Sequence, residues 1–152
     1  MKDKKTLFIL LFAVSLVIID QIVKYIVSRS MDLHQSIPLI KNVLHFTYIQ
    51  NTGAGFGIFK GQQLFLIFIS LVIIGGILFY LDRVERQVKV PFALILGGAV
   101  GNLIDRMFLG YVIDFIDFRI WPVFNVADTS ITIGAMIIAY KCFMLSHQKK
   151  SG

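Results

Sequence analysis

Four long apolar runs dominate the pattern of hydrophobic and polar positions along this chain. The runs cover residues 7–27, 64–81, 91–109 and 125–145, with most polar and charged positions gathered between them. At a rise of 1.5 Å per helical residue, a run of about 18–21 residues crosses a hydrocarbon core of roughly 30 Å. The pattern therefore predicts an all-α polytopic membrane protein with four transmembrane helices, folded as a single integral membrane domain over residues 1–152.

The stretch between the first two runs has a different pattern. In the segment LHFTYI, residues 44–49, β-branched and aromatic residues are dense and alternate positions differ in polarity, which is typical of a strand. Gly53, Gly55 and Gly57 then interrupt the pattern and permit tight turns or a close backbone approach. We expect a small β-rich segment over about residues 37–60, lying on the membrane surface.

Basic residues give the four spans a direction. On one side fall the chain ends and the loop between the second and third spans, with Lys2, Lys4, Lys5, Arg83, Arg86, Lys89, Lys149 and Lys150. On the other side fall Arg29, Lys41, Lys60 and Arg119. Since cytoplasmic loops carry the excess of lysine and arginine, we expect both termini in the cytoplasm and the β-rich segment outside it.

The first span follows a basic start, as a signal peptide would. However, no small-residue cleavage site follows the apolar run, and Asp20, Gln21 and Lys24 interrupt its second half. We therefore expect this segment to stay in the protein as an uncleaved helix.

Composition and charge support a membrane protein. The chain is 57% hydrophobic and 16% charged, whereas soluble domains are roughly 45–50% apolar and about 25% charged. Its net charge of +6 favours contact with anionic lipid headgroups, so we expect membrane lipids and no nucleic acid as partners. The single cysteine, Cys142, excludes an internal disulfide. The three histidines, His34, His45 and His147, lack metal-ligand spacing, so we expect no metal and no cofactor.

Polar residues occur inside the first and third spans. Asp20 and Lys24 lie four residues apart on one helical face, either as a pair that permits insertion or as part of a site. Asn102, Asp105 and Arg106 also share a face, and we expect the adjacent Asp105 and Arg106 to reach different partners. Just upstream, small residues Gly97 and Gly101 would let another helix approach closely.

More acids and amides lie around the last outer segment. Asp128 and Asn125 both suit a helix start, although capping alone explains one of them well and both poorly. Asp117 lies close to Arg119 at a wetter position, which favours a solvated ion pair. Asp114 and Asp128 would be brought together by the short outer loop that joins their helices.

The polar positions converge on one boundary of the predicted membrane. Eight of them fall at or near the outer face: Asp20, Asn51, Asn102, Asp105, Arg106, Asp114, Asn125 and Asp128. Ionisable groups in a membrane are functional candidates, so one shared polar site is the simplest interpretation. Two close carboxyl groups share a proton, and one then activates a water while the other polarises a carbonyl, as in aspartic proteases. Asp114 and Asp128 suit that pair.

Two other classes of function also gather carboxylates in membranes. A divalent-metal lipid phosphotransferase would want several carboxylates on adjacent helical turns, whereas these are dispersed over separate spans. A proton-linked transporter would spread its carboxylates across the membrane, whereas these crowd one leaflet.

Five sequence blocks together resemble the lipoprotein signal peptidase (signal peptidase II) family. The blocks are DQIVK (20–24), NTGAGFG (51–57), GGAVGNLIDR (97–106), VIDFID (112–117) and FNVADTS (124–130). They follow the family's order and spacing over nearly the whole chain. Val23 and Gly55 are small departures that touch no polar position.

The resemblance implies an aspartic endopeptidase of the bacterial cytoplasmic membrane, with its site near the outer face. Asp114 and Asp128 would be catalytic, while six residues would support or line the site: Asp20, Asn51, Asn102, Asp105, Arg106 and Asn125. The implied substrate is a prolipoprotein whose cysteine carries a diacylglyceryl group, cleaved just before that cysteine. We expect the enzyme to act as a monomer, with the β-rich segment beside its substrate.

Overall fold

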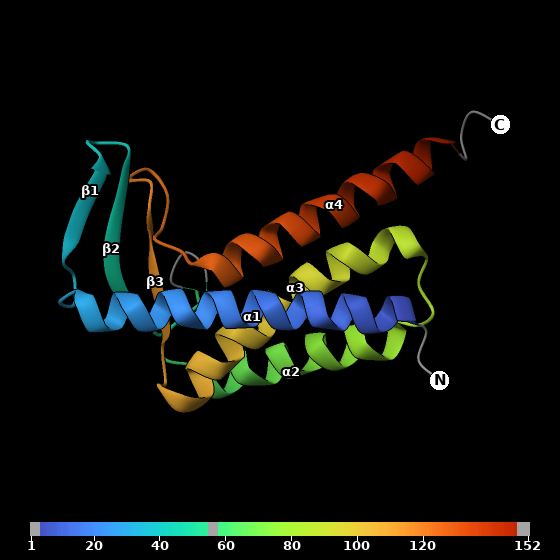
Figure 1. Cartoon of the computed structure of the whole chain (residues 1–152), viewed down its shortest axis with the longest axis horizontal. Helices are drawn as coiled ribbons and strands as arrows, with labels where there is room; N and C mark the ends of the chain where they lie inside the picture. Colours follow the sequence, from blue (N-terminus) through green and yellow to red (C-terminus); the bar gives the residue numbers. More distant parts are fainter. Residues whose placement is uncertain (1–3, 55–57, 149–152) are drawn as a thin grey trace.

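A computed structural model describes residues 4–54 and 58–148 of the chain. It contains four helices, α1 (Lys4–Ser30), α2 (Gln63–Tyr80), α3 (Arg86–Phe108) and α4 (Val126–Gln148). All four are long and apolar enough to cross a membrane, as the sequence predicts. Figure 1 shows them running away from a small sheet at one end of the molecule, with the start of α1 and the end of α4 at the other end.

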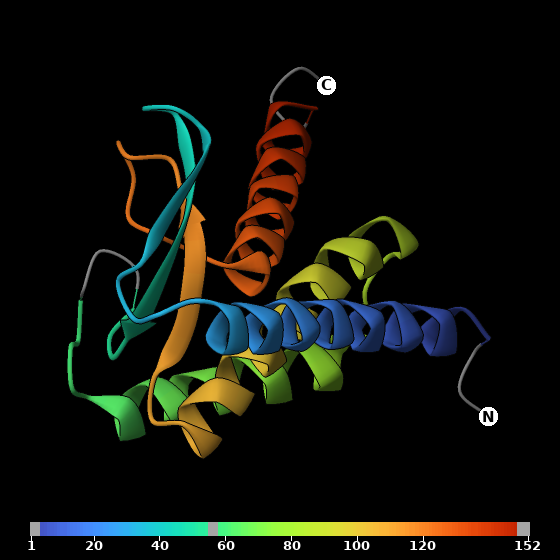
Figure 2. The ribbon, with the colours of Figure 1, turned by 60° about the vertical axis from the view of Figure 1, so that its left-hand side comes forward.

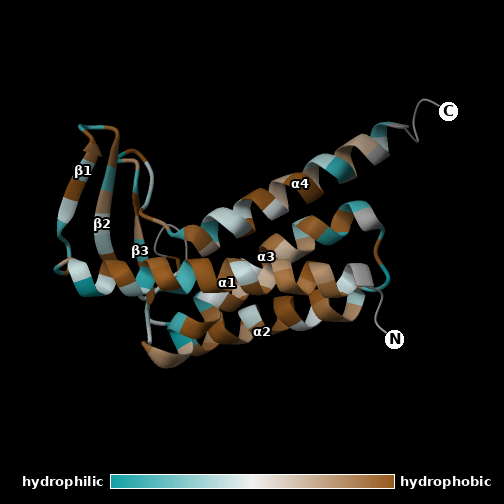
Figure 3. Ribbon diagram, in the orientation of Figure 1, coloured by the Kyte–Doolittle hydropathy of each residue, from teal (hydrophilic) through white to brown (hydrophobic). Residues whose placement is uncertain are grey.

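The helices bury little of their own apolar surface. In the most apolar window of each helix, 50% of α3 is buried inside the protein, against 11–22% of the other three. Long side chains such as Leu64 and Phe68 of α2 are exposed, and Figure 3 shows apolar residues along the helices with polar ones near the sheet and near the opposite ends of the helices. Such surfaces require lipid around them, and α3 forms the centre of the bundle.

Glycines let α3 occupy that central position. A Cβ atom on Gly97 would lie 2.9 Å from the carbonyl oxygen of Ala13 in α1, and one on Gly98 would lie 2.3 Å from that of Ala127 in α4. A Cβ on Gly101 would lie 2.6 Å from Oδ2 of Asp20. The close helix approach predicted for Gly97 and Gly101 is confirmed, and Gly98 lets α3 approach α4 equally closely.

Three antiparallel strands form the sheet, in the order β1 (Ser36–Ile40), β2 (Leu44–Asn51) and β3 (Val112–Asp117). β1 and β2 confirm the β-rich character predicted for residues 37–60, although the strands end at Asn51 and turns follow. Figures 1 and 2 show β3 as the strand nearest the helices.

β3 was not predicted, because the sequence indicated only a connecting loop between the third and fourth spans. The strand is buried on nearly all positions, so it lacks the alternation of apolar and polar residues that marks a half-exposed strand. Its partner β2 lies more than 60 positions earlier in the chain, so the pairing of Phe46 with Ile116 depends on the tertiary fold and leaves no local signal in the sequence. Val27 of α1 and Tyr48, Ile113 and Phe115 of the sheet form the apolar core that fixes β3 against α1.

Candidate active site

Asp114 lies in β3, and amide groups hold both oxygens of its carboxyl. The residue is 1% exposed. Nδ2 of Asn125 donates to Oδ1 at 2.7 Å, and Nδ2 of Asn51 donates to Oδ2 at 2.9 Å. Asn51 ends β2, and the antiparallel register that sets Ile49 opposite Asp114 brings this amide into reach. Strand pairing therefore joins the first outer segment to the polar residues of the helices.

Asp128 lies in the first turn of α4, where it takes part in capping the helix. Oδ1 of Asn125 accepts from the backbone N–H of Asp128 at 2.8 Å, and Oδ2 of Asp128 accepts from the backbone N–H of Asn125 at 3.3 Å. This reciprocal pair has the arrangement of a capping box. The interpretation that capping explains both residues poorly is therefore wrong. Oδ1 of Asp20 accepts from the N–H of Ala127 at 2.9 Å and completes the helix start.

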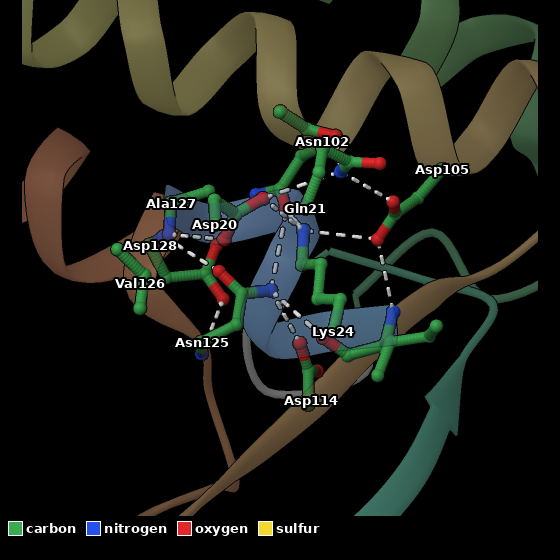
Figure 4. A network of polar contacts seen from close by, with 12 residues as sticks. Asp20, Gln21, Lys24, Asn102, Asp105, Asp114, Asn125, Val126, Ala127 and Asp128 are labelled. Atoms are coloured by element: carbon green, nitrogen blue, oxygen red, sulfur yellow. Dashed lines mark hydrogen bonds and ion pairs between the residues drawn. The ribbon is translucent and has the colours of Figure 1, made fainter. Parts of the chain in front are cut away.

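Asn102 of α3 holds the other oxygen of Asp128. Its Nδ2 donates to Oδ1 of Asp128 at 2.8 Å. Its own Oδ1 accepts from Nζ of Lys24 at 3.0 Å and from Nδ2 of Asn125 at 3.2 Å. Asn125 thus contacts both Asp114 and Asp128, and Figure 4 shows it lying between the two acids.

A buried ion group lies behind these amides. Nζ of Lys24 is 2.7 Å from Oδ2 of Asp20 and 2.9 Å from Oδ2 of Asp105, with all three side chains 2% exposed. Gln21 donates from Nε2 to Oδ1 of Asp105 at 2.9 Å, and the N–H of Ile113 in β3 donates to Oδ2 of Asp105 at 3.1 Å. The predicted Asp20–Lys24 pair is confirmed.

Sequence reasoning left Lys24 and Gln21 out of the candidate site. A signal for both was present, since Lys24 lies four residues and Gln21 one residue after Asp20 on the helix. What the sequence lacked was the partner: Asp105 shares the ammonium of Lys24 from a different helix, 81 positions away.

Arg106 reaches away from its neighbour Asp105. Its Nη2 donates to the carbonyl oxygen of Gly53 at 3.2 Å, while its buried Nε has no hydrogen-bond partner among the described residues. The expectation that Asp105 and Arg106 serve different partners is confirmed. Arg106 therefore ties α3 to the loop after β2, in which Gly55 and Gly57 lie outside the described residues.

A cavity of about 880 Å³ opens in front of the two aspartates. Four predicted site residues line it, namely Asn51, Arg106, Asp114 and Asp128, and the other four lie behind them, 0–4% exposed: Asp20, Asn102, Asp105 and Asn125. The rest of the lining includes the apolar side chains of Trp121, Phe124, Ile131 and Ile133. The structure thus brings all eight predicted residues into one assembly, with two carboxyl groups facing a largely apolar space.

The family model described as signal peptidase (SPase) II matches residues 12–144 of this chain. The chain belongs to the signal peptidase II family. Two similar proteins are the lipoprotein signal peptidases of Halothermothrix orenii and Bacillus subtilis. The first is 49% identical over 124 residues, covering 80% of this chain and 86% of the relative. The second is 40% identical over 150 residues, covering 93% and 97%.

Two solved structures share the fold of this signal peptidase. Both are described as a bacterial membrane enzyme obtained by the in meso method. One has a TM-score of 0.89 at 34% identity and covers 95% of this chain and 93% of its own; the other has a TM-score of 0.81 at 35% identity and covers 89% and 92%. The protein is therefore a peptidase that removes signal peptides from lipoproteins in a bacterial cell membrane.

Asp117 of this signal peptidase is more buried than its sequence predicts. Its ion pair with Arg119 is present, with Nη1 3.0 Å from Oδ2, but Asp117 is 5% exposed, so the interpretation of a solvated pair is wrong. Thr47 of β2 donates to the same carboxyl at 2.7 Å. Burial alone would raise the pKa of Asp117, but the hydrogen bonds from Thr47 and Arg119 outweigh it and lower that pKa. Asp117 joins β3 to β2, at a distance from the cavity.

We predict that Asp117→Asn impairs stability more than catalysis. The variant loses charge-assisted hydrogen bonds, so it should unfold more easily by about 1–3 kcal/mol. Its folded fraction should cleave substrate at close to the wild-type rate, because Asp117 does not line the cavity. Thermal unfolding and cleavage rates on the same detergent-solubilised sample measure both effects. A loss of activity as large as that of an Asp114 or Asp128 variant would contradict this division.

Proposed function

We propose that Asp114 and Asp128 form a catalytic pair that cleaves prolipoproteins just before their diacylglyceryl-cysteine. The observation that carries the proposal is that a buried carboxyl group, Asp114, and a half-buried one, Asp128, face one cavity from separate elements and share Asn125 as a hydrogen-bond partner. The donors nearest to both carboxyls are neutral amides and backbone N–H groups. Such a pair can hold a single proton, because two close carboxylates resist ionising together.

In this mechanism one carboxylate accepts a proton from a water as the water oxygen attacks the scissile carbonyl carbon. The other carboxyl is protonated and donates a hydrogen bond to the carbonyl oxygen, which carries the developing negative charge. The C–N bond then breaks as a proton passes to the cysteine nitrogen. The products are a signal peptide with a new carboxylate and a lipoprotein with a free cysteine amine. The two acids titrate as a pair, so their roles are assigned to the pair.

The lining of the cavity supports a lipid-bearing substrate. Trp121, Phe124, Ile131 and Ile133 form an apolar wall beside the carboxyl groups, at the sheet end of the helices. With both termini in the cytoplasm, as the distribution of basic residues predicts, this end lies at the outer leaflet, where a diacylglyceryl group places the scissile bond. One domain acting as a monomer among membrane lipids would suffice, since all eight site residues come from one chain.

The experiment that tests this function uses the purified protein in lipid–detergent particles. A prolipoprotein peptide with a diacylglyceryl-cysteine and the same peptide without the lipid are incubated separately, and the products are weighed by mass spectrometry. We expect the lipidated peptide alone to be cut efficiently, immediately before the cysteine, with the same rate after treatment with EDTA. Equal cleavage of both peptides, a different cut position or loss of activity on chelation would each contradict the proposal.

Acidity in the cavity gives a further prediction, on pH dependence. Burial, with a contribution from the Asp128 carboxyl, raises the pKa of Asp114 from 3.8 to about 7, while the amides of Asn51 and Asn125 oppose this rise. Because the mechanism needs one protonated carboxyl, kcat/KM should fall by about tenfold per pH unit above about pH 7. Asn51→Ala removes a donor that favours the ionised form, so this fall should move to higher pH. A fall that stays in place or moves to lower pH would contradict the assignment.

A further inference from the structure

We propose that Lys24 is a positioning residue of this active site, whose ammonium sets the orientation of Asn102 and, through it, the hydrogen bond to Asp128. The inference rests on the proposed roles of Asp114 and Asp128. Lys24 lines no part of the cavity and is 1% exposed, so it has no route to the substrate.

The two ends of the Asn102 side chain differ in what they can bind. An amide can be turned so that either its oxygen or its NH2 group faces a given neighbour, and only the NH2 group can hold a carboxylate. Lys24 has three donors and no acceptor, so its Nζ, 3.0 Å from Oδ1 of Asn102, accepts only the orientation with the oxygen toward it. That orientation sends Nδ2 to Asp128, at 2.8 Å.

Asn125 is oriented by different means. Its Oδ1 accepts from the backbone N–H of Asp128 in the first turn of α4, which leaves Nδ2 for Asp114. The backbone of α4 thus fixes the amide that serves Asp114. Asn102 contacts no backbone group in this network, and its oxygen receives its only charged donor from Lys24. The ammonium of Lys24, together with Nδ2 of Asn125, therefore orients the amide that holds Asp128, as the backbone at the start of α4 orients the amide that holds Asp114.

The surroundings of Lys24 hold it in place for this task. Asp20 of its own helix and Asp105 of α3 each approach Nζ within 3 Å, so two of its protons are taken by carboxylates and the third is left for Asn102. The other charged groups nearby are Arg106 of α3 and the acids of the pair, Asp114 and Asp128. The positive charge also opposes protonation of Asp114 through space.

Removing the ammonium should change the protonation of the catalytic pair. In Lys24→Met, the oxygen of Asn102 keeps its 3.2 Å contact with Nδ2 of Asn125 but loses its charged donor. Asn102 then turns its oxygen toward Asp128 more readily, and that contact requires Asp128 to be protonated. We expect kcat to fall by about 10- to 100-fold, the value of a hydrogen bond to a charged group. We also expect the pH profile of kcat to move upward by about one pH unit. Lys24→Arg keeps the charge and should keep the profile near that of the wild type.

The matched control is Lys89→Met. Lys89 is also a lysine of a membrane helix that donates to an uncharged side chain, Oγ1 of Thr6 at 3.1 Å, but it lies near the start of α3, away from the sheet and the cavity. The Lys89→Met substitution therefore removes one positive charge and one hydrogen bond to an uncharged side chain, as Lys24→Met does at Asn102. A general effect of removing a hydrogen-bonded lysine from a membrane helix would appear in both variants, whereas we expect the pH profile of Lys89→Met to match the wild type.

A double-mutant cycle tests whether Lys24 acts through Asn102. We expect Lys24→Met/Asn102→Leu to have the kcat of Asn102→Leu alone, within about twofold, because the second change removes the group that Lys24 orients. Losses that multiply, or an unshifted pH profile in Lys24→Met, would overturn the proposal. If Lys24→Met does not fold, Lys24→Met/Asp20→Asn keeps the net charge of the ion group and is compared with Asp20→Asn. If instead Asp114→Asn and Asp128→Asn prove active, the proposed function itself is wrong, whatever the cycle gives.

Discussion

Asp114→Asn and Asp128→Asn should each abolish cleavage of a lipidated prolipoprotein while leaving a folded, membrane-inserted protein. Asparagine keeps the size of the side chain and one acceptor oxygen, so contacts such as that of Asn51 Nδ2 with residue 114 can persist. It cannot take a proton from water or share one with the other acid. Loss of the acid–base partner should reduce the rate by at least about 10²- to 10⁴-fold.

Cleavage of the diacylglyceryl peptide, followed by gel shift, measures this loss, with thermal unfolding of the same samples as the test of folding. Asp117→Asn is the matched control, since it makes the same chemical change on the same strand, three residues from Asp114. Normal processing by Asp114→Asn or by Asp128→Asn would remove that residue from the catalytic pair.

Among the helical glycines of the described residues, Gly98 should be the one where an added methyl group does the most damage. The added Cβ would lie 2.3 Å from the carbonyl oxygen of Ala127 and 2.7 Å from Cγ1 of Ile131, so α3 and α4 would have to separate. Overpacking of this kind destabilises by about 1–3 kcal/mol. Because Ala127 precedes Asp128, the separation also displaces the carboxyl that we propose to be catalytic, and a shift of about 1 Å costs roughly 10²-fold in rate.

Gly75→Ala is the control for this prediction. A Cβ on Gly75 of α2 meets nothing within 4 Å, so the change adds the same methyl group to a helix in open space. We expect it to stabilise the protein by up to about 1 kcal/mol, the helix-propensity gain of alanine over glycine, and to leave activity unchanged. If Gly98→Ala were as stable and as active as Gly75→Ala, the tight α3–α4 contact would not be what positions Asp128.

The spans and the site residues could be predicted because their signals are local. A run of apolar residues long enough for lipid is visible without any tertiary information, and so is the choice of one leaflet by eight polar positions. Gly97 and Gly101 indicated a close helix contact by their spacing alone. The identity of the two candidate acids also followed, since Asp114 and Asp128 flank one short connection.

What the sequence could not supply are the facts that depend on distant partners. β3 is buried on both faces, so its sequence lacks the polar–apolar alternation that would have identified a strand. It also pairs with a strand more than 60 positions earlier, which the local sequence does not reveal. The sequence predicted a solvated pair because Arg119 follows Asp117 closely in the outer segment, whereas the structure buries Asp117 and adds a hydrogen bond from Thr47 of β2. The sequence offered Lys24 one partner, Asp20 on its own helix. Its ion pair with Asp105 and its hydrogen bond to Asn102 form only because α1 packs against α3.

The central claim is that the two acids activate water directly, and a single turnover in H2¹⁸O tests it. Enzyme in excess over lipidated prolipoprotein is allowed one round of cleavage, and both the released signal peptide and the digested enzyme are weighed. Direct attack by water predicts one ¹⁸O in the new carboxyl terminus of the signal peptide and none in the enzyme. Label in the enzyme peptide that contains Asp114 or Asp128 would reveal a covalent acyl-enzyme and contradict the account.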